Sequence, residues 1–77
     1  MANIYIALGS NLEDPVRQIT VAISLIAITS DFKVLKKSSF YETSPIGFTN
    51  QPNFINAVIK ITSKQPPHNI LVELQRI

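Results

Sequence analysis

The stretch FINAVIKIT, residues 54–62, constrains the fold more than any other part of this 77-residue chain. Apolar side chains recur at every second position, which is the period of a β-strand with one buried face. The chain must therefore build a sheet and cover one of its faces with other apolar residues. The predicted core face consists of Ile55, Ala57, Ile59 and Ile61, and the opposite face carries Phe54, Asn56, Val58 and Lys60.

Two segments with helical periodicity can supply that cover. Asp14 and Pro15 form a helix start, because an N-cap acceptor is followed by proline at the first helical position. This helix is expected to run to about Thr29, and Pro66-Pro67 is expected to open a second helix. The apolar stripe of the first helix is Val16, Ile19, Ile23 and Ile26, and that of the second is Ile70, Leu71, Leu74 and Ile77.

Two further stretches are predicted to be strands. Residues 3–8, NIYIAL, are continuously apolar after the asparagine, which is typical of a strand that is covered on both faces or central in a sheet. Residues 32–41 change to a period of two, as in a strand with one better-buried face. One side carries Phe32, Val34 and Phe40, and the other carries Lys33, Lys37 and Ser39 together with Leu35.

The predicted order β-α-β-β-α defines an α+β fold, with an antiparallel sheet and helices on one face. It corresponds to a ferredoxin-like β-α-β-β-α-β unit that is truncated before its last strand. The second helix also reaches Ile77 without a glycine cap or a breaker, so residues 1–77 are expected to be a single domain fragment of something longer. Without the last strand, Ile4–Leu8 becomes an exposed apolar edge, and self-association through this edge is expected.

Composition narrows the classes of function. The chain has no cysteine, which excludes disulfides and thiolate metal sites. The formal charge of +2 comes from scattered residues, and it gives no reason to expect nucleic acid or a membrane surface. The start MANIYIALGSN has neither the basic region nor the long apolar run of a signal peptide, and no apolar run is long enough to span a bilayer. A cytoplasmic protein is expected.

The connection between the last two strands, roughly Glu42 to Asn53, is much longer than the two to five residues of most hairpin loops. Long loops of this kind are often functional. Pro45 and Pro52 stiffen its ends, and Gly47 permits a backbone angle that other residues avoid.

Just after the loop, the Asn56 carboxamide offers donors and an acceptor to a planar heterocycle, and an aromatic ring beside it can stack on that heterocycle. An alternative is purely structural. Phe48 and Phe54 then pack under the loop, and Asn56 caps a backbone group.

Three motifs occur in order along the chain: YIALGSNL at residues 5–12, SSFYETSPIG at 38–47 and QPNFINAV at 51–58. Together they resemble the N-terminal half of 6-hydroxymethyl-7,8-dihydropterin pyrophosphokinase, a folate-pathway enzyme. The resemblance runs from about Ile4 to Ile77 and covers about half of the family's usual length. It implies the transfer of a pyrophosphoryl group from ATP to the pterin hydroxymethyl group, with two magnesium ions.

The resemblance also implies which residues form the site. Phe54 stands where many members have tyrosine, so a hydroxyl is lost, and Ser44 stands where a proline is common. The turn of Gly9, Ser10 and Asn11 borders the pterin site, and Gln75 matches a glutamine near the nucleotide. The implied pterin-binding positions are Thr43, Ser44, Pro45, Ile46, Phe54 and Asn56.

The chemistry of transfer is expected to lie elsewhere. In the family, the aspartate pair that holds magnesium and the basic residues that grip the ATP phosphates follow the last helix of this chain. The sequence has no D-x-D pair and no phosphate-binding loop, and Glu13-Asp14 is explained by the helix start, where negative charge is favourable. No catalytic residue and no metal ligand is therefore expected here, and the chain alone is expected to be inactive.

Two other functions compete with this one. A ferredoxin-like module can bind a small flat ligand without any chemistry of its own. An RNA-binding domain of similar fold needs a basic, glycine-containing strand with several aromatic residues. FINAVIKI has neither the glycines nor the further aromatics, so the RNA-binding alternative ranks last.

Overall fold

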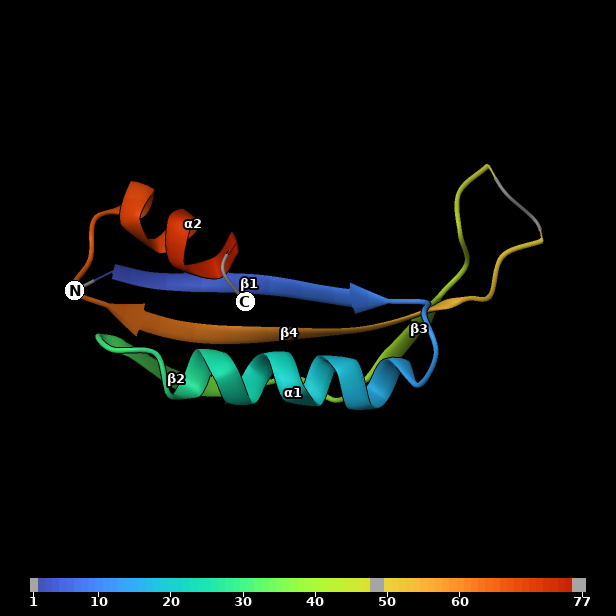
Figure 1. Ribbon diagram of the computed structural model, residues 1–77, viewed down its shortest axis with the longest axis horizontal. Helices are drawn as coiled ribbons and strands as arrows, with labels where there is room; N and C mark the ends of the chain where they lie inside the picture. The colour runs from blue at the N-terminus through green and yellow to red at the C-terminus, as the bar shows by residue number, and fades with distance from the viewer. Residues whose placement is uncertain (1, 48–49, 76–77) are drawn as a thin grey trace.

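The structure is a computed structural model that describes residues 2–47 and 50–75 (Figure 1). The described residues form an antiparallel sheet with two helices, which confirms the predicted α+β, ferredoxin-like arrangement. The elements are β1 (Ala2–Ser10), α1 (Pro15–Ala27), β2 (Phe32–Lys37), β3 (Tyr41–Thr43), β4 (Phe54–Ser63) and α2 (Pro67–Gln75).

Strand β4 organises the sheet, because β1, β2 and β3 all pair with it in antiparallel register. The strand order is β1-β4-β2, with β3 following β2 along the same side of β4. The predicted core face of β4 is confirmed: Ala57, Ile59 and Ile61 are no more than 1% exposed, and Ile55 is half-buried. A shift of one residue would turn this whole face to solvent, so the burial pattern fixes the register.

Helix α1 begins as predicted. The Asp14 side chain accepts a hydrogen bond from the Arg17 backbone nitrogen at 3.4 Å, and Pro15 is the first helical residue. Ile19 and Ile26 are at most 2% exposed, whereas Val16 is 44% exposed. The prediction was wrong for Val16, because at 100° per residue it lies about 70° around the helix from the other two.

Helix α2 covers the same face of the sheet as α1. Ile70 is 4% exposed and belongs to one core cluster with Ile26, Ile59 and Ile61. Leu71, predicted to share the stripe, is 54% exposed because adjacent residues on a helix point about 100° apart. Ile77, the last residue of the predicted stripe, lies outside the described residues. Neither helix in the described part of the chain is long and apolar enough to cross a membrane.

The single strand predicted over residues 32–41 is wrong, because the structure divides it into β2 and β3. The pairing with β4 shifts by one residue between Val34 and Lys36, and this bulge reverses the alternation of side chains. Lys37 therefore lies opposite Ile59, and Phe40 is 44% exposed instead of joining the core. Ser38 bridges the gap: its nitrogen donates to the Val58 carbonyl at 2.8 Å, and its Oγ accepts from the Val58 nitrogen at 2.9 Å.

Strand β1 lies at one edge of the described sheet, as expected for the first strand without a further partner. The expectation that it is covered on both faces was wrong. Tyr5 is 70% exposed and Asn3 and Ala7 are also exposed, because both helices lie on the other face. The Lys60 ammonium lies 5.8 Å from the centre of the Tyr5 ring, within the range of a cation–π contact on this open face.

Candidate functional site

The loop between β3 and β4 projects beyond the sheet at the end where β1 finishes, away from α2 (Figure 1). It spans residues 44–53, which is shorter than predicted, because Glu42 belongs to β3 and pairs with Ile55. Gly47 has φ of 80°, a left-handed conformation that glycine permits. Phe48, which one interpretation placed under the loop, lies outside the described residues.

The Asn56 side chain lies at the junction of three strands. Its neighbours across the sheet are Gly9 of β1 and Tyr41 of β3, and the side chain is half-buried. The Nδ2 atom donates to Thr43 Oγ1 at 2.8 Å and approaches the Tyr41 and Phe54 carbonyl oxygens at 3.4 and 3.5 Å. The alternative in which Asn56 caps a backbone group thus accounts for the contacts of Nδ2 with the two carbonyl oxygens. These contacts also hold the carboxamide in a fixed place at the base of the loop.

Gly9 makes room for that carboxamide. A Cβ atom at position 9 would lie 2.9 Å from Asn56 Oδ1, closer than a carbon and an oxygen normally approach. A glycine within a strand often marks such a close approach. The turn motif that begins at Gly9 is therefore tied physically to Asn56, although 47 positions separate the two residues.

Phe54 lies beside the same turn. It lines a hollow of about 420 Å³ between the end of β1 and α1, a volume within the range of small-ligand sites. The other residues around this hollow are Leu8, Gly9, Ser10, Asn11, Leu12, Gln18, Ile19 and Ala22. The fold thus brings one predicted pterin-binding residue next to the turn that was predicted to border the site.

The remaining predicted positions are spread along the loop and beyond it. Thr43 ends β3 and contacts Asn56, Ser44 is exposed, and Pro45 is half-buried. Ile46 is 96% exposed and does not line the hollow beside Phe54. Gln75 ends α2, and its side chain lies outside the described part of the structure, so its role near a nucleotide remains a prediction.

Sequence analysis assigned no role to Gln51, which lies beside the site. Asn11 Nδ2 donates to Gln51 Oε1 at 3.2 Å and to the Pro52 carbonyl at 3.4 Å, which joins the first turn to the end of the loop. Gln51 opens the motif QPNFINAV, but its local sequence gives no sign of a partner 40 residues away.

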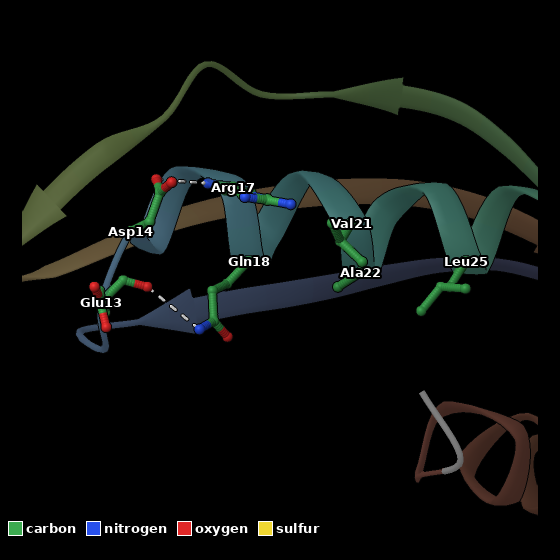
Figure 2. Close-up of a pocket in the computed structure, with 7 residues that line it drawn as sticks. All are labelled: Glu13, Asp14, Arg17, Gln18, Val21, Ala22 and Leu25. Atoms are coloured by element: carbon green, nitrogen blue, oxygen red, sulfur yellow. Dashed lines mark hydrogen bonds between the residues drawn. The ribbon is translucent and has the colours of Figure 1, made fainter.

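A larger hollow, of about 620 Å³, runs along α1 and contains none of the predicted pterin-binding residues. Figure 2 shows that its polar groups serve the helix: Asp14 caps the Arg17 nitrogen, and Gln18 Nε2 donates to the Glu13 carbonyl at 3.3 Å. The side chains come from a single helix and its cap, so they line an open surface rather than converging on a ligand. We therefore assign no function to this larger hollow.

Metal ligands do not gather in the described part of the chain, which holds no group of three or more histidine, cysteine, aspartate or glutamate side chains that could bind an ion. Glu13 and Asp14 are adjacent, but Asp14 already caps α1. Magnesium needs carboxylates that face a substrate phosphate. We therefore assign no magnesium ligand among the described residues.

Comparison with known proteins gives consistent matches. The protein named 2-amino-4-hydroxy-6-hydroxymethyldihydropteridine pyrophosphokinase from Haemophilus influenzae is 46% identical over 77 residues, which cover 100% of this chain and 48% of that protein. The protein of the same name from Bacillus subtilis is 38% identical over 73 residues, covering 95% of this chain and 44% of its own length. The folic acid synthesis protein fol1 of Pneumocystis carinii is 45% identical over 74 residues, covering 96% of this chain and 10% of its own length.

This chain thus spans about half the length of the two bacterial relatives. The sequence pattern of one family matches residues 5–77, which is nearly the whole chain and includes residues 5–10 of β1, the loop and Asn56. The chain belongs to the 7,8-dihydro-6-hydroxymethylpterin-pyrophosphokinase family.

Proposed function

We propose that residues 1–77 form the pterin-binding part of an enzyme that transfers a pyrophosphoryl group from ATP to 6-hydroxymethyl-7,8-dihydropterin. The observation that carries this proposal is the fixed carboxamide of Asn56, set between three strands at the base of the loop. A carboxamide presents a donor and an acceptor in one plane, which suits the alternating polar groups along the edge of a pterin ring. Family membership supports the same ligand.

The other proposed contacts follow from where each residue lies. Thr43 contacts Asn56, and residues 44–46 continue from it along the limb of the loop that leaves β3. Backbone groups of residues 43–46 would meet the polar edge of the pterin. Phe54 offers a ring for stacking, and this does not require the hydroxyl that a tyrosine would add. The domain proposed for residues 1–77 is the N-terminal half of the pyrophosphokinase domain.

Transfer of a phosphoryl group depends on positioning and on neutralising charge with metal ions and basic side chains. We assign no magnesium ligand among the described residues, and so no step of the transfer is assigned to them. We propose that Mg²⁺ and most ATP contacts come from sequence outside residues 1–77, since the bacterial relatives are about twice as long. Gln75 is the one proposed ATP contact here, and a cytoplasmic location, where ATP is available, belongs to the same proposal.

The proposal predicts binding without turnover by the 77-residue chain. In a titration with 6-hydroxymethylpterin followed by ¹⁵N NMR, the backbone amides of Thr43, Ser44 and Ile46 and the side-chain amide of Asn56 should shift. Incubation with ATP, Mg²⁺ and the dihydropterin should give no product, because the charge-neutralising groups are missing. Adenine, a flat ring with a different polar edge, is the control ligand. Shifts confined to other residues would refute the proposed site, and turnover would refute the account of the missing groups.

We also propose that the chain associates with itself through the edge of β1 that has no partner strand in the described sheet, because such an edge can pair with another strand. Its apparent mass in light scattering should rise with concentration. Ala7→Lys places a charge on the exposed face of this strand and should shift the chain toward the monomer. Ala27→Lys, at the exposed end of α1, adds the same charge elsewhere and should leave the association unchanged. A constant monomer mass for the unaltered chain at all concentrations would contradict this proposal.

A further inference from the structure

The contact between Asn11 and the end of the loop joins two segments that the sequence separates widely. Asn11 is half-buried in the turn after β1, and its Nδ2 atom donates to Gln51 Oε1 at 3.2 Å and to the Pro52 carbonyl at 3.4 Å. Gln51 and Pro52 are exposed, so burial contributes little to holding them. The hydrogen bonds from Asn11 therefore help to fix the position of this limb of the loop.

The held segment leads directly into the proposed pterin site. Phe54 lies two residues after Pro52, and Asn56 lies four residues after Pro52. Proline fixes its own φ angle, so fixing the Pro52 carbonyl also restricts the path of the chain toward Phe54. The same turn also contacts the site on the adjacent strand, because Gly9 lies against Asn56 Oδ1. The turn of residues 9–11 thus touches the site at two points, one under Asn56 and one at the loop.

We propose that Asn11 and Gln51 are positioning residues: their contact sets the end of the loop, and with it Phe54, relative to the carboxamide of Asn56. This inference rests on the proposed function of the site. Neither residue needs to touch the ligand. A contact that restricts residues 51–54 in advance lowers the entropic cost of ordering them on binding.

The experiment compares five forms of the chain with the unaltered one. Asn11→Ala removes the donor, and Gln51→Ala removes one acceptor. The double variant Asn11→Ala/Gln51→Ala tests whether the two act as a unit. Gln51→Glu keeps an acceptor oxygen at the same reach and serves as the conservative variant. Asn3→Ala, an exposed asparagine at the opposite end of β1, is the matched control.

Two measurements are made on each form. Amide hydrogen exchange of the ligand-free chain reports how firmly residues 50–56 are held, and calorimetry with 6-hydroxymethylpterin gives the dissociation constant. Asn11→Ala and Gln51→Ala should each speed exchange at residues 50–56 and raise the dissociation constant about three- to tenfold, the range expected for one net hydrogen bond. The double variant should bind 6-hydroxymethylpterin about as tightly as the weaker-binding of the two single variants. Gln51→Glu and Asn3→Ala should match the unaltered chain.

The outcomes separate this inference from the proposed function. If the unaltered chain gives no binding heat with the pterin, the proposed function fails, and the exchange data still decide whether Asn11 holds the loop. If the chain binds but Asn11→Ala leaves both exchange and affinity unchanged, only the positioning role is overturned. An equal loss in Gln51→Glu and Gln51→Ala would also overturn it, because the acceptor oxygen would then be irrelevant.

Discussion

Replacing Ile59 with alanine is expected to lower the free energy of unfolding by about 3 kcal/mol, because the change leaves a cavity in the centre of the core. Ile59 is 0% exposed, and it shares one cluster with Ile26, Phe32, Ile61 and Ile70. A domain of this length has roughly 4–12 kcal/mol of stability in total, so the loss is a large part of it. Urea denaturation followed by circular dichroism measures the effect.

Ile28→Ala removes the same atoms from a side chain that is 79% exposed, and it provides the matched control. It should change the stability by no more than about 0.5 kcal/mol. Similar losses for Ile59→Ala and Ile28→Ala would mean that the face of β4 predicted to be buried does not form the core.

Asn56→Ala is expected to weaken the binding of 6-hydroxymethylpterin by about ten- to a hundredfold. The variant removes the donor and the acceptor that the proposal assigns to the ring edge, and each polar group left unpaired on binding costs about 1–3 kcal/mol. Calorimetry measures the dissociation constant. The thermal midpoint should fall much less than for Ile59→Ala, because Asn56 is only half-buried and lies outside the core cluster.

Asn3→Ala is the control for this second prediction, since Asn3 is exposed on the same face at the other end of β1. It should leave the affinity unchanged. If Asn56→Ala binds the pterin as tightly as Asn3→Ala, Asn56 serves only the contacts with Thr43 and the β3 backbone, and the proposed ligand contact is wrong.

Local patterns in the sequence predicted most of the framework. The alternation in residues 54–62 identified β4 and its buried face, and Asp14-Pro15 identified the start of α1. These signals are reliable because strand period, helix period and N-cap chemistry depend on atoms only a few residues apart. The motifs around Gly9, Thr43 and Asn56 pointed to one family, and the match over residues 5–77 confirmed that family.

The tertiary structure decided the features that depend on pairing between distant segments. The bulge after Val34 and the exposed face of β1 follow from how those strands align with β4 and from where both helices lie. The placement of Gly9 under Asn56 and of Asn11 beside Gln51 has the same origin. Residues 40 or more positions apart leave no periodic trace in each other's neighbourhood, so only the folded chain reveals which of them meet.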